Sequence, residues 1–259
     1  VVLVHGLAAS SESCYGIPGI LNAFGYNVIC PDLPGHGGSL GTHCPPDPVS
    51  MSHAVAEVMH AANVSRAHLV GHSLGGGVLL GFTHNYPRQV QSLTLVASGG
   101  LGTHLSPALR AVASLPGAFH ALRLTLRRPT VGALRYFSKV SSSRSWFAAR
   151  LPEGSFQSVQ ALMDPERLRF FVSTTRSVSD RNGQVLDGSP ALRKIPASRI
   201  LFVTCEKDPI ISPQDSVVNS ANLPGSRLLV VPGSSHEPHH HSTPEFVQSL
   251  DSLMYSCPE

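Results

Sequence analysis

The sequence has few charged and few aromatic residues, and it has no long apolar run. Charged side chains make up 14% of the 259 residues, aromatic side chains 6% and hydrophobic side chains 42%. This balance is typical of a packed globular protein and excludes an intrinsically disordered chain. No stretch approaches ~18 consecutive apolar residues, so we expect no membrane-spanning helix.

The start of the chain lacks a secretory signal pattern, and the cysteines lack a metal-binding or redox spacing. There are five cysteines, an odd number, and no C-x-x-C occurs among them. Two of them, Cys30 and Cys205, lie in apolar runs that are typical of strands. We therefore expect reduced, mostly buried thiols and a cytoplasmic protein.

Lysine and arginine are concentrated in the middle of the chain. Residues 102–194 hold 14 Lys or Arg against 5 Asp or Glu, whereas the rest of the chain holds 5 against 11. This asymmetry favours a solvated helical face, with attraction of an acidic substrate or partner as the alternative. The basic residues form no tight run and no aromatic residues interleave with them, so the sequence does not predict nucleic-acid binding.

Short apolar runs rich in β-branched residues recur along the chain and predict buried strands. They lie at residues 1–4, 27–30, 68–71, 92–97, 199–205 and 227–231. Segments with helical spacing separate most of them, for example residues 50–64, 74–86 and 245–254. This alternation predicts an α/β fold with a doubly wound, mostly parallel sheet that helices cover on both faces.

The alternation stops in the middle of the chain. Several prolines and helix-like pieces occur there, including residues 164–178, whereas residues 122–127 alternate with period two and stay ambiguous. We expect a mainly helical insertion that sits over the sheet. The predicted domains are a core of residues 1–101 and 195–259 and a helical cap of residues 102–194.

The segment GHSLGG, residues 71–76, follows a predicted buried strand and opens a predicted helix. It matches G-x-S-x-G, in which a serine on a sharp strand-to-helix turn exposes its hydroxyl. Gly71 and Gly75 let neighbouring backbone approach closely, and the helix that begins at Leu74 directs free N–H groups toward Ser73. A tight turn capped by the serine is the alternative, but the strand–turn–helix context favours a nucleophile.

An earlier loop offers the backbone donors that an oxyanion requires. The segment HGLAASS, residues 5–11, directly follows the first apolar run. Its His5–Gly6 pair permits a tight turn that can present the N–H of Leu7 to the same point as the N–H of Leu74. We expect these two N–H groups to form an oxyanion hole, and we expect His5 to shape the loop rather than to react.

Five segments together resemble the α/β-hydrolase family, on its serine-nucleophile branch of capped, esterase-like and lipase-like enzymes. They are HGLAASS (5–11), PDLPGHGGS (31–39), GHSLGG (71–76), EKDPI (206–210) and GSSHEPHH (233–240). The resemblance covers both ends of the chain and leaves out the centre, where the family carries variable caps. These segments are specific for the fold and poorly specific for the substrate.

The resemblance implies the chain order nucleophile, acid, base. We expect the acid to be Asp208, which follows a late apolar run, with Glu206 as its competitor; residues 97–100, after the preceding run, hold no carboxylate. The base should follow the last strand, which gives His236. The implied mechanism is an acyl-enzyme reaction in which His236 deprotonates Ser73, Asp208 orients His236, and no metal or organic cofactor is needed.

The loop of His236 also contains H-E-x-x-H, which binds zinc when both histidines lie on one face of a helix. The small residues 233–235 precede it and indicate a loop, and Pro238 between the two histidines would break a helix interior. No third ligand occurs at a suitable spacing. We therefore predict no metal site, and we expect residues 239–241 in the loop or at the start of a helix.

Three further side chains are candidates for the surroundings of the site. His72 resembles a residue that is common before the nucleophile in this family, and we expect it to line the substrate site. His36 is expected to order its own loop. Trp146, the only tryptophan, is expected in the cap core, with a substrate contact as the alternative.

The implied partner is a small-molecule acyl substrate, most directly a carboxylic ester. A lactone, a thioester, an amide or a vinylogous C–C bond would use the same residues, and so would a haloperoxidase-like enzyme. A ligand-binding member without turnover is a different class of alternative. No pattern indicates an oligomeric state.

Members of the family usually have two further strands before the HG loop. The chain here starts with VVLVHG, which would leave an exposed apolar edge at residues 27–30. We therefore expect either N-terminal strands that are missing before Val1 or poor solubility of the chain as it stands.

Overall fold

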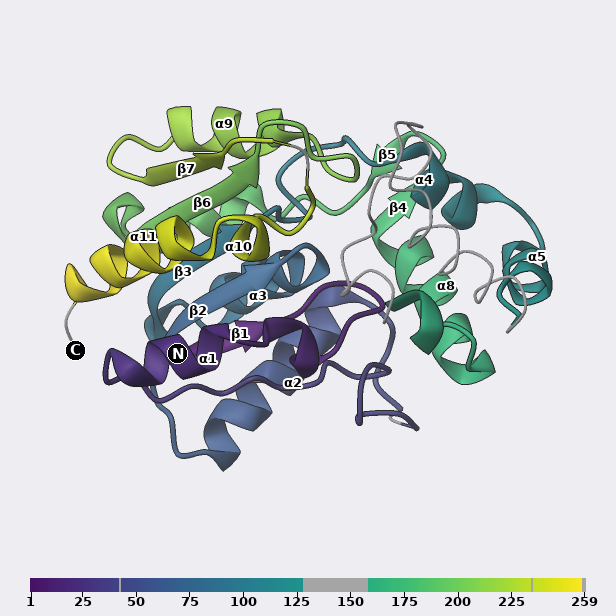
Figure 1. Ribbon diagram of the computed structural model, residues 1–259, viewed down its shortest axis with the longest axis horizontal. Coiled ribbons are helices and arrows are strands. Elements are labelled where there is room, and N and C mark those ends of the chain that lie inside the picture. Colours follow the sequence, from purple (N-terminus) through teal and green to yellow (C-terminus); the bar gives the residue numbers. More distant parts are fainter. Residues whose placement is uncertain (42, 128–157, 234, 258–259) are drawn as a thin grey trace, which may run out of the picture.

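The structure is a computed structural model that describes residues 1–41, 43–127, 158–233 and 235–257. In these residues a five-stranded parallel sheet forms the centre, in the order β1-β2-β3-β6-β7 (Figure 1). The strands are β1 (Val2–Val4), β2 (Ala67–His72), β3 (Val90–Val96), β6 (Ile200–Cys205) and β7 (Arg227–Val231). The predicted α/β fold with a mostly parallel sheet is confirmed.

Helices cover both faces of this sheet because successive side chains of a strand point to opposite faces. On β2, Leu69 belongs to one buried cluster and the next residue, Val70, belongs to the other. The helices packed on the first face are α2 (Pro48–Ala61) and α3 (Leu74–Asn85), and those on the second are α1 (Ile17–Ala23) and α11 (Thr243–Tyr255).

The predicted strand at residues 27–30 is reduced to a single bridge. Ile29 pairs in parallel with Val2. Two backbone hydrogen bonds of 2.9 Å hold it, from Leu3 N–H to Ile29 O and from Ile29 N–H to Val1 O. In the part of the chain that the structure describes, no strand pairs with the far side of Ile29.

The described residues of the predicted cap lie mostly beside the carboxyl ends of the strands (Figure 1). Their described elements are α4 (Pro107–Ser114), α5 (Ala118–Thr125), α8 (Pro165–Val178), β4 (Ser179–Asp180), β5 (Gly183–Gln184) and η3 (Ser189–Lys194). Helix α8 packs against both α4 and α5. The ambiguous residues 122–127 mostly complete α5, and the β4–β5 hairpin has no counterpart in the sequence prediction.

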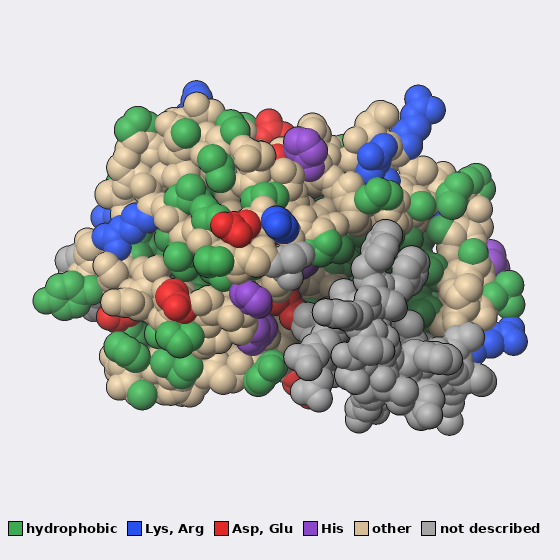
Figure 2. All heavy atoms as spheres, turned by 45° about the horizontal axis from the view of Figure 1, so that its top comes forward, with side chains coloured by type: hydrophobic (Ala, Val, Ile, Leu, Met, Phe, Trp, Pro, Cys, Tyr) green, Lys and Arg blue, Asp and Glu red, His purple; other side chains and the backbone are tan. Residues whose placement is uncertain are grey.

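The remaining described elements are short and lie in or near the core. They are η1 (Ser11–Cys14), η2 (Pro87–Gln89), η4 (Ala197–Arg199), α9 (Pro213–Ala221) and α10 (Pro238–His241). Of the helices described, none is both long and apolar enough to cross a membrane. On the face shown in Figure 2, Lys and Arg side chains lie in separate small groups. The absence of a nucleic-acid partner stays a prediction.

Candidate active site

Ser73 joins the end of β2 to the start of α3, and its backbone is strained. Its φ of 53° and ψ of −115° lie where a residue with a side chain is rarely found. Two glycines make the turn possible. A Cβ on Gly71 would lie 2.6 Å from the carbonyl oxygen of Gly75, and one on Gly75 would lie 2.3 Å from that of Val4. The turn holds the Ser73 hydroxyl at the carboxyl edge of the sheet.

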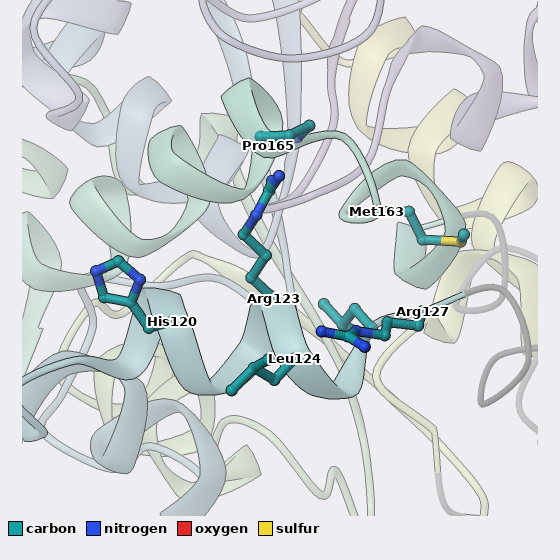
Figure 3. A pocket seen from close by; sticks show the side chains of 7 residues that line it. His120, Arg123, Leu124, Arg127, Met163 and Pro165 are labelled. Atoms are coloured by element: carbon teal, nitrogen blue, oxygen red, sulfur yellow. The ribbon is translucent and has the colours of Figure 1, made fainter.

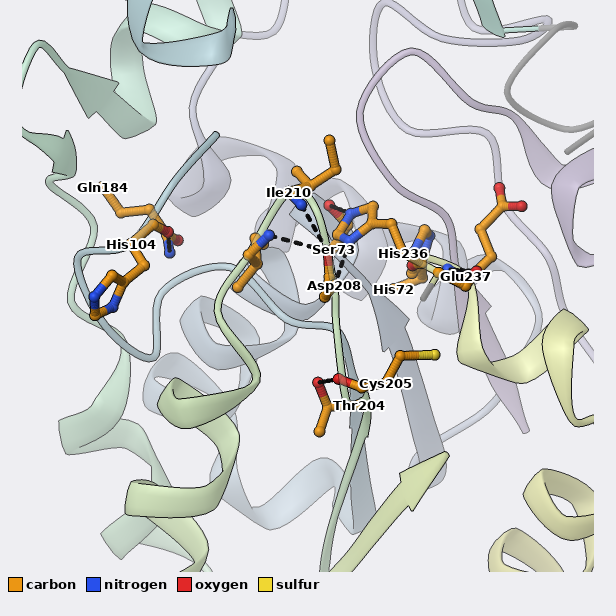
Figure 4. Close-up of polar contacts among 12 residues, drawn as sticks. His72, Ser73, His104, Gln184, Thr204, Cys205, Asp208, Ile210, His236 and Glu237 are labelled. Atoms are coloured by element: carbon orange, nitrogen blue, oxygen red, sulfur yellow. Dashed lines mark hydrogen bonds and ion pairs between the residues drawn. The ribbon is translucent and has the colours of Figure 1, made fainter. Parts of the chain in front are cut away.

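The side chains of Ser73, Asp208 and His236 come together from three separate loops, which follow β2, β6 and β7 (Figure 4). His236 Nδ1 lies 2.8 Å from Asp208 Oδ2, and His236 Nε2 lies 2.9 Å from Ser73 Oγ. An ionised carboxylate can only accept hydrogen bonds, so Nδ1–H donates to Asp208. In the neutral ring, Nε2 is then the acceptor for the Ser73 hydroxyl.

The backbone of its own loop fixes the carboxylate of Asp208. The side chain is fully shielded from solvent, and Oδ1 accepts the N–H groups of Ile210 at 2.8 Å and Ile211 at 3.1 Å. The competing acid of the sequence prediction, Glu206, is exposed and accepts the N–H of Gly233 at 3.2 Å instead. The structure therefore brings the expected carboxylate, and not its competitor, to the imidazole.

A cavity of about 60 Å³ opens beside Ser73, where core and cap residues meet. Leu7 and Leu74, the expected oxyanion residues, both line it. Leu74 is the first residue of α3, so its N–H has no acceptor within the helix. Most other side chains in the wall are apolar, among them Leu105, Leu109, Val178, Leu186, Ile210 and Ile211. No charged side chain of the described residues lines the cavity.

His72 is not among the described residues that line this cavity, although the sequence predicts it in the wall of the substrate site. Its Nε2 lies 2.7 Å from the carbonyl oxygen of His236. The centroid of its ring lies 5.0 Å from that of His236 and 4.7 Å from that of His239. Burial and the neighbouring His236 lower the pKa of His72 to about 3, so the ring is neutral at pH 7. Trp146 lies outside the described residues.

His5 fixes the loop that carries Leu7. Its Nε2 accepts the N–H of Leu33 at 3.0 Å, and its Nδ1–H donates to the carbonyl oxygen of Gly6 at 2.8 Å. Burial lowers the pKa of His5 to about 4, which keeps the ring neutral, and the two bonds require the tautomer with its proton on Nδ1. His36, expected to order its own loop, bonds through Nδ1 to the Pro34 carbonyl at 3.0 Å.

Gln184 on β5 is a cavity residue that the sequence prediction missed. Its Oε1 accepts the N–H of Gly100 at 2.8 Å, and its Nε2 donates to the carbonyl of His104 at 2.8 Å. It thereby ties the β4–β5 hairpin to the loop after β3. A signal was present, because the Asn182–Gly183 pair is typical of tight hairpin turns. Asp180 Oδ1 accepts both N–H groups of that pair, at 2.7 and 3.2 Å.

The loop after β3 also reaches α9 through His104. His104 Nδ1 lies 3.1 Å from Asp215 Oδ1, whereas Asp215 Oδ2 is buried without a hydrogen-bond partner. Gly102 passes over the carboxylate, since a Cβ there would lie 2.3 Å from Oδ1. Burial raises the pKa of Asp215, and the bond from His104 opposes that shift. Burying this carboxylate is therefore unfavourable, and the single hydrogen bond from His104 offsets the cost only in part.

The two histidines of H-E-x-x-H do not share a helix. His236 precedes α10, and His240 lies within it. His240 Nε2 lies 2.6 Å from the carbonyl oxygen of Ser13, so the ring donates there. Within the described ranges, no three His, Cys, Asp or Glu side chains gather as metal ligands would.

A second pocket, of about 490 Å³, lies among described residues of the predicted cap (Figure 3). Its described lining comes from α5 and from the residues around the start of α8, and it includes His120, Arg123 and Arg127. The two pockets share none of these described residues. Because this lining is basic, the second pocket suits a different chemical group from the uncharged cavity.

The sequence has relatives among characterised and uncharacterised proteins. A model of the alpha/beta hydrolase fold family matches residues 1–242. An uncharacterized protein of Mycobacterium tuberculosis is 30% identical over 258 residues, which cover 98% of this chain and 74% of that protein. A 2-hydroxy-6-oxo-6-phenylhexa-2,4-dienoate hydrolase of Burkholderia cepacia is 29% identical over 252 residues, which cover 91% of this chain and 80% of that enzyme.

Solved structures share the same architecture. The meta-cleavage product hydrolase of Pseudomonas fluorescens aligns with a TM-score of 0.74 at 17% identity, over 99% of this chain and 90% of that one. A thermophilic esterase of Thermogutta terrifontis aligns with a TM-score of 0.70 at 20% identity, over 99% of this chain and 89% of that one. At these identities the likeness concerns the fold.

Proposed function

The chain belongs to the alpha/beta hydrolase fold family, and on this premise we propose that it is a serine hydrolase that cleaves a carboxylic ester, or a related acyl bond, of a small molecule. One observation carries the proposal. It is the hydrogen-bonded series Asp208–His236–Ser73 at the carboxyl edge of the sheet. Such a series is the arrangement that activates a serine hydroxyl for acyl transfer.

In the proposed reaction Ser73 is the nucleophile and His236 is the general base. His236 Nε2 takes the hydroxyl proton while Oγ attacks the acyl carbon, and it then passes this proton to the leaving group. Asp208 keeps the other proton on Nδ1 and stabilises the imidazolium. Water activated by the same imidazole then cleaves the acyl-enzyme and releases the acid. The proposed steps use only side chains and backbone groups of the chain.

The N–H groups of Leu7 and Leu74 are the proposed donors to the oxyanion. The position of both residues in the wall of the cavity beside Ser73 supports this assignment. The start of α3 adds the positive end of the helix dipole at the same point. Losing one such donor costs on the order of 3 kcal/mol of transition-state stabilisation.

The substrate class follows from the wall of the cavity. The described wall is mostly apolar and uncharged, which favours a neutral acyl group over a charged one. A volume of about 60 Å³ is far below the ~300 Å³ of a typical small-molecule site, so we expect a short acyl chain. Leu105, Leu109 and Leu186 line the cavity from the cap side, and we expect them to limit that chain length.

Hydrolysis of a C–C bond is the second candidate, and the relatives favour it. The Burkholderia cepacia enzyme is a 2-hydroxy-6-oxo-6-phenylhexa-2,4-dienoate hydrolase, and the Pseudomonas fluorescens enzyme is a meta-cleavage product hydrolase. A dienoate carries a carboxylate, however. The described wall of the cavity offers no cationic side chain to pair with it, which is why we place the ester first.

The first experiment is labelling with a fluorophosphonate probe. Ser73→Ala is compared with wild type and with Ser252→Ala, which changes an exposed serine on α11. We expect wild type and Ser252→Ala to be labelled and Ser73→Ala to be unlabelled. Folded wild-type protein that takes up no probe, or a Ser73→Ala variant that is labelled like wild type, would contradict the proposal.

The second experiment separates the two candidate reactions. Wild type is assayed with p-nitrophenyl esters of increasing acyl-chain length and with 2-hydroxy-6-oxo-6-phenylhexa-2,4-dienoate. We expect turnover of the esters, fastest for the short chains. Turnover of the dienoate without turnover of any ester would replace the ester proposal by C–C cleavage on the same three residues.

A further inference from the structure

His72 bonds to the backbone of the proposed base rather than to its ring. The Nε2 atom of His72 lies 2.7 Å from the carbonyl oxygen of His236. A carbonyl oxygen carries no hydrogen, so Nε2 must hold the proton and donate it. The bond therefore anchors the main chain of the residue whose imidazole meets Ser73 at 2.9 Å.

The other side of the His72 ring contacts the loop that carries Leu7. A Cβ added to Gly6 would lie 3.0 Å from His72 Nδ1 and 3.2 Å from the Cβ of Ser73. Glycine at this position leaves the space that the ring occupies. His72 thus lies between the proposed oxyanion loop and the loop of the base, and it directly precedes the proposed nucleophile in the chain.

His239 packs against His72 and adds no charge beside it. It is 7% exposed, its ring centroid lies 4.7 Å from that of His72, and its Nδ1 is buried without a partner. Burial, followed by the proximity of His72, lowers the pKa of His239 well below its ordinary value. The neutral ring of His72 therefore adjoins the proposed base, the neutral ring of His239 packs behind it, and neither repels the imidazolium that forms on His236 during the reaction.

We propose that His72 is a positioning residue, whose Nε2–H holds the main chain of His236 so that the imidazole keeps its contact with Ser73 throughout turnover. The inference rests on the proposed function of that site. It differs from the role that the sequence predicts for His72, which is to line the substrate site. A positioning residue changes kcat, whereas a residue that only binds substrate changes KM.

Three substitutions separate the hydrogen bond from the volume of the ring. His72→Phe keeps a ring and removes the donor. His72→Gln carries an amide N–H at about the reach of Nε2, and His72→Asn carries one that stops near the place of Nδ1. With a short p-nitrophenyl ester, we expect kcat to fall about tenfold in the Phe and Asn variants with KM unchanged within about twofold. The Gln variant should recover kcat to within about threefold of wild type.

The kinetics of these variants distinguish a positioning role of His72 from a role in substrate binding. A raised KM with an unchanged kcat would return His72 to the substrate site and overturn the inference, and so would equal kcat values in all three variants. If His72→Phe does not fold by circular dichroism, the comparison of Gln with Asn decides. His60→Phe, at an exposed histidine of α2, is the matched control and should behave as wild type.

The inference and the proposed function fail in different ways. Labelling and turnover in Ser73→Ala at the wild-type level would remove the proposed nucleophile, whatever the His72 variants do. If Ser73→Ala is inactive and His72→Phe and His72→Asn both turn over at the wild-type rate, the proposed function stands and the positioning role is wrong.

Discussion

Different kinds of contact hold the residues at the carboxyl edge of the core and the residues of the cap beside it. At the core edge, backbone groups fix the site: Asp208 accepts two N–H groups of its own loop, and Ser73 sits on a turn whose glycines face backbone atoms. In the cap, Gln184 bonds to the loop after β3 mainly through its side chain, which makes two hydrogen bonds beside one backbone bond of 2.9 Å from its N–H to the carbonyl oxygen of Thr103. Backbone contacts leave little room to adjust, whereas side-chain joints can shift. We expect changes at the core edge to have large effects and changes in the cap to have graded ones.

The largest contrast is expected between two carboxylates. Asp208→Asn should lower kcat/KM by about 10⁴-fold, because the amide no longer holds the tautomer that leaves Nε2 free to accept the Ser73 proton. Asp187→Asn changes an exposed cap carboxylate that accepts the N–H of Ser189 at 3.0 Å. That variant should stay within about twofold of wild type. Ester kinetics on both variants measure the difference, and a loss below about tenfold in Asp208→Asn would assign the acid to another residue.

The difference between the core edge and the cap also explains which features of the structure could be predicted from the sequence. Ser73 and Asp208 follow buried strands, His236 follows the apolar but half-exposed edge strand β7, and parallel strands bring their carboxyl ends to one edge. The three positions could therefore be predicted together without knowledge of any distance. Helices were predictable too, since α3 is apolar over most of its length and the buried residues of α11 recur at helical spacing.

Other features depend on hydrogen-bond partners or neighbouring strands that the sequence alone does not identify. His72 was expected in the wall of the cavity, but its partner is a backbone carbonyl 164 residues away, and any residue type supplies a carbonyl. Gln184 sits in a hairpin with two residues in each strand, too short for a period-two pattern. The run at residues 27–30 has the composition of a strand, yet composition cannot supply a neighbour on its outer side.

The next comparison is between substitutions at two glycines, and it concerns the free energy of unfolding rather than the reaction rate. Gly75→Ala would place a Cβ 2.3 Å from the carbonyl oxygen of Val4, which is backbone and cannot turn away, so we expect a loss of about 3 kcal/mol in the free energy of unfolding. Gly117 at the start of α5 has φ +77° and no atom within 4 Å of such a Cβ. Gly117→Ala should therefore cost about 1 kcal/mol, from backbone strain alone. Urea denaturation measures both, and equal losses would contradict the proposed rigidity of the core edge.

A substitution at Gln184 tests whether weakening the contact between the cap and the loop after β3 has only a moderate effect on KM and kcat. Gln184→Ala removes both side-chain bonds to the loop after β3, each with a net contribution of about 1 kcal/mol, and keeps the backbone bond from residue 184 to Thr103. We expect the substitution to loosen the hairpin that leads to Leu186 in the cavity wall. We expect KM to rise about fivefold to tenfold and kcat to change less than about threefold. Gln248→Ala, at an exposed glutamine of α11, is the matched control. A loss of kcat as large as that of Asp208→Asn would remove the distinction between the two regions.

The smallest expected effect concerns Asp215, where a core helix meets the loop below the cap. Burial raises its pKa above the ordinary 3.8, so the folded state binds the proton more tightly than the unfolded state does. The resulting stability is fully present below the ordinary pKa and is lost as pH rises through the higher, folded-state pKa. Asp215→Asn keeps an oxygen for His104 and removes the charge that Oδ2 buries without a partner.

The free energy of unfolding of Asp215→Asn, relative to wild type, should therefore increase as pH rises through the folded-state pKa of Asp215 and level off above it. Urea denaturation at a series of pH values gives this difference directly. A difference that stays flat, or that falls as pH rises, would mean that the bond from His104 outweighs the burial of the carboxylate. The joint between α9 and the loop would then be a stabilising ion pair, and this contact would belong with the rigid core edge rather than with the adjustable cap.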